Sequence, residues 1–223
     1  MTDRLAILFD IDGTLIESGG AGAAAWREAF QELYGVPADI GQYTDAGMTD
    51  PEVGRLTFER VIGREPSARE LARLLARRNT LLPGTVAESK GYRVLPGVPE
   101  LLPHLCEEGY LLGLVTGGVE ASAHIKLERA HLNRYFHFGG YGSDSSDRVE
   151  LTRKALERAG TILGRRLLHD EVLVVGDTPL DISAGHAADT VAVGVATGHY
   201  TKEQLAEAGA DYVVGTLEEE LPL

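Results

Sequence analysis

The chain has 223 residues, of which 43% are hydrophobic and 25% are charged, and its formal net charge is −13 at pH 7. This composition is that of an ordinary folded protein, and the acidic excess argues against a nucleic-acid or anionic-membrane partner, because both would need a basic face. The single cysteine excludes an internal disulfide and a zinc–thiolate cluster. Neither a secretory signal nor an apolar run of membrane-spanning length is recognisable, so we expect a cytoplasmic location. The oligomeric state is left open.

The first apolar run, residues 5–9, is short and rich in bulky side chains, which predicts a buried strand. Residues 16–91 are predicted to form helices and loops. Apolar side chains recur there at helical spacing in three stretches that start near residues 23, 51 and 67. Asp50 is predicted to be the N-cap of the second of these helices, because Pro51 follows it at a favoured first-turn position.

From residue 92 onward, apolar strands alternate with helices. The predicted strands are 111–115, 136–140, 172–175, 191–195 and 212–214, and the predicted helices lie near 98–108, 120–131, 149–162, 180–187 and 201–208. Alternation of this kind implies a parallel sheet covered on both faces. We therefore predict an α/β fold. It has a doubly wound, Rossmann-like parallel-sheet core (1–15 and 92–223) and an all-helical cap (16–91) inserted after the first strand.

Two carboxylates, Asp10 and Asp12, directly follow the first predicted strand. On an extended backbone, residues i and i+2 point to the same side and lie roughly 6.6 Å apart, so both can face one ligand. Gly13 permits a sharp turn after them, and Thr14 adds a hydroxyl. An isolated pair of this kind is equally typical of a capping turn, so the chemistry depends on what the other strands carry.

The strand at 111–115 is followed by Thr116, Gly117 and Gly118, a hydroxyl and two small residues whose backbone N–H groups can cradle phosphate oxygens. A simple N-cap role for Thr116 explains the local sequence as well. The strand at 172–175 is followed by Asp177, and Asp181 falls in the first turn of the next helix. Ligands of open α/β sheets bind at the carboxyl ends of strands, so these groups together suit a hard cation, a nucleophilic carboxylate and phosphoryl oxygens.

These residues resemble the motifs of the haloacid dehalogenase-like hydrolase superfamily. The segment 10–14 resembles its first motif, Thr116 and Gly117 its second, and the segment 176–181 its fourth. The helical segment between the first and second motifs resembles the cap of the phosphoglycolate phosphatase-like branch. The third motif departs from the family pattern, which places a lysine at the start of the helix after the third strand. Arg148 stands there instead and is the predicted phosphate clamp, with Lys154, nearly two turns into the helix, as the alternative.

The resemblance implies that Asp10 is the nucleophile that forms an aspartyl-phosphate. It further implies that Asp12 is first the general acid for the leaving alcohol and then the general base for water. Mg²⁺ would be held by Asp10, by the backbone carbonyl of Asp12 and by Asp177. Asp181 would be a ligand through water or would orient the others.

Donors for the phosphoryl group would be the Thr116 hydroxyl, the backbone of Gly117 and Gly118, and Arg148. In the cap, Thr49 and Asp50 are candidate contacts for the leaving group, and Arg55 is a candidate partner for a substrate carboxylate. The resemblance thus implies a Mg²⁺-dependent phosphatase for a small phosphorylated metabolite, with 2-phosphoglycolate as the first candidate. The alternatives are a sugar phosphomutase, a sugar- or nucleotide-phosphate phosphatase of the same fold, and a non-catalytic phosphate-binding protein.

Overall fold

The computed structural model describes residues 4–223, and its core is a six-stranded sheet in the order β5-β4-β1-β6-β7-β8. Every neighbouring pair of strands is parallel, which confirms the predicted fold class. In chain order these strands are β1 (Ala6–Phe9), β4 (Leu111–Thr116), β5 (Gly139–Tyr141), β6 (Val172–Gly176), β7 (Val191–Val195) and β8 (Tyr212–Val214).

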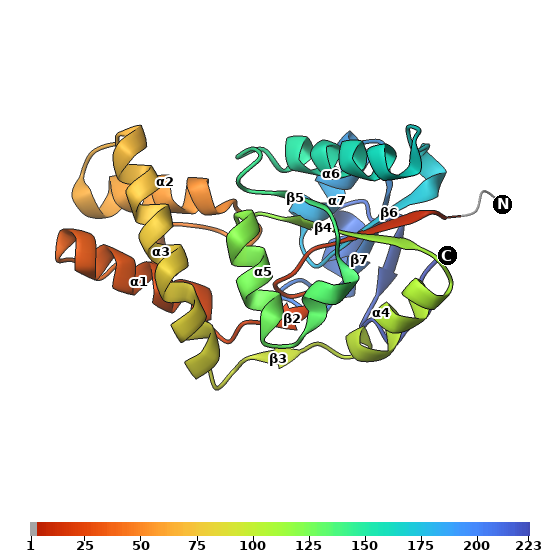
Figure 1. Cartoon of the computed structure of the whole chain (residues 1–223), viewed down its shortest axis with the longest axis horizontal. Coiled ribbons are helices and arrows are strands. Elements are labelled where there is room, and N and C mark those ends of the chain that lie inside the picture. The colour runs from red at the N-terminus through yellow and green to blue at the C-terminus, as the bar shows by residue number, and fades with distance from the viewer. Residues whose placement is uncertain (1–3) are drawn as a thin grey trace.

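Helices cover both faces of this sheet (Figure 1). Alternate residues of β1 face opposite sides, so that Ile7 and Phe9 share one apolar core with helices α4 and α5, while Ala6 and Leu8 share another with α6. Helices α7 and α8 pack over β6, β7 and β8. The helices are α4 (Val98–Glu107), α5 (Glu120–Glu128), α6 (Arg148–Leu163), α7 (Pro179–Ala187) and α8 (Lys202–Glu207), with single-turn helices η2 (Leu132–Tyr135) and η3 (His169–Glu171).

The helices between residues 17 and 93, which precede α4 in the chain, stand to one side of the sheet (Figure 1). They are α1 (Ala21–Tyr34), α2 (Asp50–Ile62) and α3 (Ala68–Glu88), with the short η1 (Ile40–Gln42) after α1. These helices share an apolar core of their own, in which Trp26, Phe30 and Phe58 are buried. We refer to residues 16–91 as the cap, and the domain boundaries at 15/16 and 91/92 stay a prediction.

Two short strands join the cap to the sheet. β2 (Ile16–Glu17) pairs antiparallel with β3 (Arg93–Val94), so the chain leaves and re-enters the core through a two-stranded ribbon. The prediction that the segment from residue 16 onward contains only helix and loop is therefore wrong at its first two residues. A two-residue strand is too short to show the alternation by which strands are recognised in a sequence.

Two element boundaries also differ from prediction. Helix α2 begins at Asp50 and has Thr49 at its N-cap, so the assignment of Asp50 as N-cap is wrong. The Asp50 carboxylate instead accepts hydrogen bonds from α5, as described below. The predicted strand 136–140 is β5 at 139–141, because Phe136 and Phe138 pack into the cores from the loop before it.

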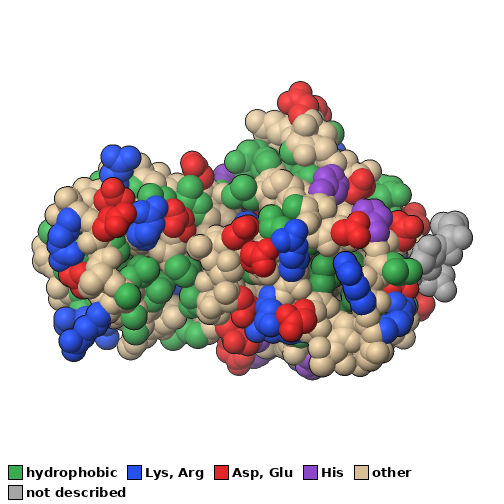
Figure 2. All heavy atoms as spheres, turned by 90° about the horizontal axis from the view of Figure 1, so that it is seen from above, with side chains coloured by type: hydrophobic (Ala, Val, Ile, Leu, Met, Phe, Trp, Pro, Cys, Tyr) green, Lys and Arg blue, Asp and Glu red, His purple; other side chains and the backbone are tan. Residues whose placement is uncertain are grey.

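The surface carries charges of both signs. Acidic and basic side chains are interspersed over the face displayed in Figure 2. Within residues 4–223, no helix has both the length and the apolar character needed to cross a membrane. That nucleic acid is not a partner stays a prediction.

Candidate active site

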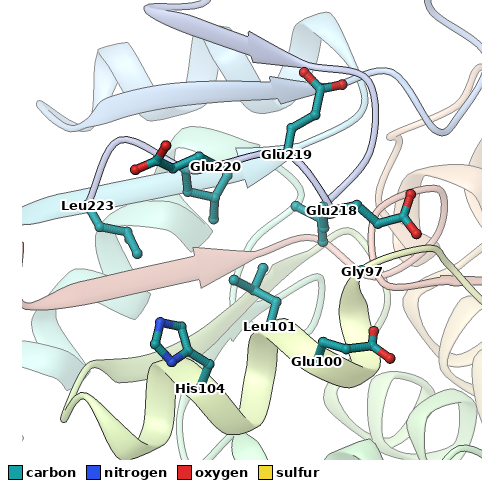
Figure 3. A pocket seen from close by; sticks show the side chains of 10 residues that line it. Gly97, Glu100, Leu101, His104, Glu218, Glu219, Glu220 and Leu223 are labelled. Carbon is teal, nitrogen blue, oxygen red and sulfur yellow. The ribbon is translucent and has the colours of Figure 1, made fainter.

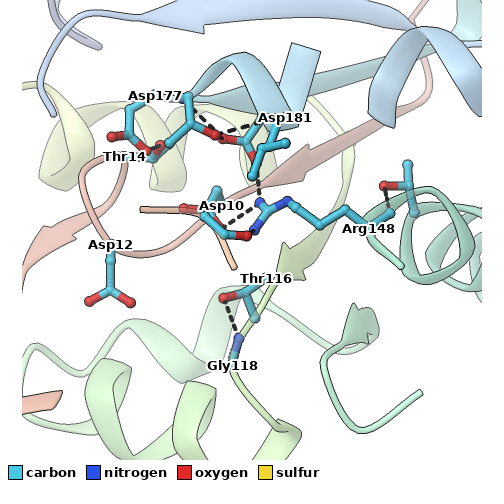
Figure 4. A network of polar contacts seen from close by, with 12 residues as sticks. Asp10, Asp12, Thr14, Thr116, Gly118, Arg148, Asp177 and Asp181 are labelled. Atoms are coloured by element: carbon cyan, nitrogen blue, oxygen red, sulfur yellow. Dashed lines mark hydrogen bonds and ion pairs between the residues drawn. The ribbon is translucent and has the colours of Figure 1, made fainter. Parts of the chain in front are cut away.

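Asp10 lies at the carboxyl edge of the sheet, one residue beyond β1 (Figure 4). The register aligns Phe9 with Leu114 of β4 and Val175 of β6, so the residues that follow these three strands reach the same edge. The amide of Asp10 still donates to the carbonyl of Val175 at 2.9 Å, which fixes its backbone, and its side chain is buried. The topology therefore brings the first, second and fourth sequence motifs together.

Arg148, the first residue of α6, is buried and links three parts of the site. Its Nη2 lies 3.2 Å from Asp10 Oδ1 and also forms an ion pair with Asp181, while its Nη1 donates to the carbonyl of Gly47 in the cap at 2.7 Å. Lys154 instead pairs with Glu157 at 2.7 Å, and its side chain is 40% exposed. Of the two cations that the sequence leaves open for the third motif, Arg148 is the one at the site.

The carboxylates of Asp10, Asp177 and Asp181 each place an oxygen within 4.8 Å of the others, and all three residues are buried. Burial, reinforced by the neighbouring Asp181 carboxylate, raises the pKa of Asp10 well above its ordinary value and that of Asp177 to about 7. Among the described residues, the Arg148 guanidinium is the one cation paired with this cluster, so ionisation of all three carboxylates requires further positive charge. A buried group of three carboxylates with that imbalance is suited to a divalent cation with oxygen ligands.

Glycines on two sides enclose Asp177. A Cβ added at Gly13, whose φ is +86°, would lie 2.4 Å from Asp177 Oδ2, and one added at Gly198 would lie 1.8 Å from the same atom. No larger residue fits at either position without moving the carboxylate. Gly13 belongs to the first motif, whereas Gly198, in the loop after β7, escaped the sequence analysis because nothing in its neighbourhood resembles a motif.

The segment after β4 faces the site from the other side. The Thr116 hydroxyl is buried and accepts a hydrogen bond from the amide of Gly118 at 3.2 Å, so this amide holds Thr116 in place. The carbonyl of Gly117 accepts from the amide of Asp50 at 2.7 Å. A Cβ at Gly117 would lie 2.4 Å from the carbonyl oxygen of Met48, so glycine is required where the cap loop meets the core.

A cavity of about 200 Å³ lies between the cap loop and these residues. Thr49, a predicted leaving-group contact, is buried at the start of α2 and is not among the lining residues, although its neighbours Met48 and Asp50 are. The charged residues that line the cavity are Asp10, Asp12, Glu17, Asp50, Lys126, Arg148 and Asp177.

Comparison with known proteins identifies the family. The model of the haloacid dehalogenase-like hydrolases matches residues 5–189. The chain belongs to this family. A phosphoglycolate phosphatase of Salmonella typhimurium is 27% identical over 234 residues, a match that covers 97% of this chain and 90% of the relative. The predicted family and the resemblance to its phosphoglycolate phosphatase-like branch are thereby confirmed.

Solved structures of similar fold agree with this assignment. A hydrolase from Pseudomonas syringae has a TM-score of 0.70 at 25% identity, with 96% of this chain and 94% of that chain covered. A protein from Bacteroides vulgatus assigned as a β-phosphoglucomutase has a TM-score of 0.69 at 24% identity, with 96% and 85% covered. The second likeness establishes the shared fold alone.

Two contacts at the site of this hydrolase were missed by sequence reasoning. The ammonium group of Lys126 on α5 forms an ion pair with Asp12. The Asp50 carboxylate accepts hydrogen bonds from the amide of Val119 at 2.9 Å and from the Ser122 hydroxyl at 3.1 Å. The sequence does carry a signal for Lys126. It lies on the same helical stripe as the apolar Ala123 and Leu127, a position where a purely solvent-exposed lysine would be unusual.

A larger hollow of the hydrolase, of about 680 Å³, lies between α4 and the C-terminal residues (Figure 3). Four glutamates line it, and its only basic side chain is that of His104. An anionic phosphate ester would be repelled there, so the smaller cavity at the strand ends is the better candidate despite its size. The residues that line the hollow are Gly97, Glu100, Leu101, His104, Leu217, Glu218, Glu219, Glu220, Leu221 and Leu223.

Proposed function

We propose that this hydrolase is a Mg²⁺-dependent phosphatase of small phosphomonoesters, with 2-phosphoglycolate as the first candidate substrate. The observation that carries the proposal is the Asp10 carboxylate, which is buried beside the Arg148 guanidinium and opens into a cavity lined by further carboxylates. A carboxylate can attack a phosphate ester only if cations and donors offset the repulsion between the two anions. The family match and the phosphatase relatives support a phosphoric monoester hydrolase.

The residues present fit a divalent metal ion. Asp10 and Asp177, with the backbone carbonyl of Asp12, would hold it, and when bound it would neutralise charge on the phosphoryl oxygens. Both oxygens of Asp181 are engaged, because Oδ1 pairs with Arg148 and Oδ2 accepts from the amide and hydroxyl of Thr178. We therefore assign Asp181 to the orientation of Arg148 and to the capping of α7 rather than to direct ligation.

The reaction proceeds in two steps. A carboxylate oxygen of Asp10 attacks phosphorus, the ester P–O bond breaks, and Asp12 gives its proton to the departing alkoxide. Water then attacks the phosphorus of the aspartyl-phosphate, Asp12 accepts its proton, and the bond to Asp10 breaks to release inorganic phosphate. The Thr116 hydroxyl, the Gly117 amide and Arg148 donate to the phosphoryl oxygens, and Gly118 contributes by holding Thr116.

The volume of the cavity supports a small substrate. About 200 Å³ is below the roughly 300–1,000 Å³ of typical ligand pockets. The cap loop also closes directly on the core, with the amide of Asp50 bonded to the carbonyl of Gly117. A small ester such as 2-phosphoglycolate suits this space better than a nucleotide.

The test is phosphate release from a panel of small phosphomonoesters, with Mg²⁺ or with a chelator. We expect release that needs the metal and that falls on the order of 10⁴-fold or more in Asp10→Asn, because the nucleophile is lost. Asp170→Asn, at an exposed aspartate, is the matched control and should keep the wild-type rate. An unchanged rate in Asp10→Asn would refute the mechanism. Phosphoryl transfer between sugar phosphates without net phosphate release would instead identify a mutase.

A further inference from the structure

Lys126 is a buried cation outside the sequence motifs of the family. It lies on α5, its side chain is 9% exposed, and its ammonium group pairs with Asp12. Among residues 4–223, that ammonium group has no hydrogen-bond or ion-pair partner other than Asp12. Burial of a lysine ammonium group is unfavourable unless a carboxylate pairs with it. The ion pair with Asp12 therefore explains how a lysine can lie on the buried side of α5.

Asp12 differs from the other carboxylates of the site. Asp10, Asp177 and Asp181 are buried and bonded to Arg148, Thr14 or Thr178. The Asp12 carboxylate stands apart from that network, as Figure 4 shows, and its side chain is 41% exposed. The bond from Lys126 is made to Oδ2, and no other side chain of the described residues bonds to this carboxylate. Lys126 is thus the one described side chain that restrains it.

Lys126 itself is held in place by the segment that returns from the cap. Its backbone carbonyl accepts a hydrogen bond from the Tyr92 hydroxyl at 2.7 Å. The Arg129 guanidinium lies 4.6 Å from the centre of the Tyr92 ring and donates to the carbonyl of Ser89 at 2.9 Å. The last turn of α5 is therefore fixed to the chain between α3 and β3, and the base of the lysine side chain has a defined position.

We propose that Lys126 is a positioning residue for Asp12, an inference that rests on the proposed phosphatase function. The ammonium group binds Oδ2 of Asp12, which lines the cavity, and leaves Oδ1 without a side-chain partner among the described residues. That oxygen gives a proton to the leaving alkoxide and later takes one from water. Lys126 keeps its own protons in both steps. General acid–base groups work only when held within hydrogen-bond reach of the reacting atom, so a freely rotating Asp12 would be a poor catalyst.

Substrates with different leaving groups can distinguish a role of Lys126 in positioning the general acid from a role in binding or in structure. An alkoxide must be protonated as it leaves, whereas p-nitrophenolate leaves without a proton. For Lys126→Met we expect kcat on 2-phosphoglycolate to fall about 10- to 100-fold, within the range of general acid catalysis, with KM changed less than about twofold. The first-turnover burst of p-nitrophenol from p-nitrophenyl phosphate should change less than about threefold, because that burst precedes the step in which Asp12 acts as base.

Three further proteins sharpen the test. Lys126→Arg keeps a donor cation and should recover part of the lost kcat. Lys202→Met removes a lysine that likewise pairs with a carboxylate, at 2.9 Å from Glu219, but that is 46% exposed. This variant should leave both activities unchanged. The double variant Asp12→Asn with Lys126→Met should be no slower on 2-phosphoglycolate than Asp12→Asn alone, because Lys126 acts through Asp12.

Two kinetic outcomes would overturn the proposal. A raised KM for 2-phosphoglycolate with kcat unchanged would show that Lys126 binds the substrate itself. Equal losses in the first turnover with both esters would show a merely structural role.

Thermal unfolding of the wild type, Asp12→Asn, Lys126→Met and the double variant tests the contact without any activity. Non-additive shifts in melting temperature are expected, since Asp12→Asn leaves the ammonium group buried without its partner, and additive shifts would refute the contact. If the wild type hydrolyses neither ester, the proposed function fails, and this cycle alone decides whether Lys126 holds Asp12.

Discussion

The two sides of the active-site cavity differ in what they contribute. The sheet side supplies charged side chains, chiefly Asp10, Lys126 and Arg148. Asp10 follows β1, whereas Lys126 and Arg148 lie on helices α5 and α6. The cap side supplies mainly backbone, because the carbonyl of Gly47 accepts from Arg148 and the amide of Asp50 donates to the core. The cap therefore meets the core mainly through neutral backbone groups, which can exclude water from a bound substrate without competing with the catalytic charges.

The cap contributes two carboxylates to the lining of the cavity, Glu17 and Asp50, and the second is used for closure. Asp50 Oδ2 accepts from the amide of Val119 and from Ser122, and it lies 3.2 Å from Nη1 of Arg78 on α3. The Arg78 side chain is 2% exposed, and its guanidinium lies 5.5 Å from the centre of the Trp26 ring. A buried charge cluster thus joins α2 and α3 of the cap to the N-terminus of α5.

The largest effect on the sheet side, after loss of the nucleophile, is expected from Arg148→Met. The guanidinium is the donor that links Asp10 to Asp181, so its removal should lower kcat/KM for 2-phosphoglycolate about 10²- to 10³-fold, as loss of one preorganised donor does elsewhere. Lys154→Met, which removes an exposed cation of the same helix, should leave kcat/KM unchanged. A large loss in Lys154→Met and none in Arg148→Met would reverse the assignment of the third motif.

On the cap side, Arg78→Met is expected to act on stability. It leaves the buried Asp50 carboxylate without its cation, which should lower the free energy of unfolding by about 3 kcal/mol. Urea unfolding followed by the fluorescence of Trp26, the single tryptophan and a member of the cap core, reports this change.

Arg77→Met is the matched control for that experiment. Arg77 is adjacent in sequence, but it pairs with Glu32 on the surface, so its loss should change the free energy of unfolding by less than about 1 kcal/mol. Equal effects of the two variants would mean that the buried cluster does not anchor the cap.

The third prediction concerns pH and the metal. The pKa of Asp177 is about 7 in the folded protein against an ordinary value of 3.8, so between these values the folded state keeps a proton that the unfolded chain has lost. This group makes the metal-free protein less stable as pH rises through that window, with no further loss above it. Mg²⁺ needs the ionised carboxylate, so the rise in melting temperature that Mg²⁺ causes should be larger near pH 8 than near pH 5.5.

The size of that rise follows from mass action. Mg²⁺ at about a hundred times its Kd stabilises the folded state by about 2.7 kcal/mol, which for a chain of this length is roughly 5–10 °C. Differential scanning calorimetry at the two pH values measures it, and Asp177→Asn should abolish most of the difference. A rise that is equal at both pH values, or larger at the lower one, would contradict a site built on Asp177.

The residues at the strand ends could be predicted from the sequence, whereas the ion pairs between distant segments could not. The strand order was not needed to predict the site, because Asp10, Thr116 and Asp177 each directly follow an apolar run and parallel strands end at one edge. The pairs Asp12–Lys126 and Asp50–Arg78 join segments that are distant in the chain, and no local pattern specifies them. The start of α2 was misassigned for the same reason, since the Asp50 side chain bonds to Val119 of the core rather than to its own helix.

The smallest effect is expected at Arg55, the cap residue that the sequence offers as a partner for a substrate carboxylate. Its guanidinium instead bonds to Glu52 at 2.8 Å and to Glu59 at 3.4 Å on the surface of α2, and it is not among the residues that line the cavity. Arg55→Met should therefore leave KM for 2-phosphoglycolate and for p-nitrophenyl phosphate within about twofold of wild type, and exposed pairs of this kind contribute less than about 1 kcal/mol to stability. An increase in KM confined to 2-phosphoglycolate would mean that α2 presents a charge to the leaving group. The cap would then select substrates by charge as well as by closure, and the division between a charged sheet side and a backbone cap side would fail.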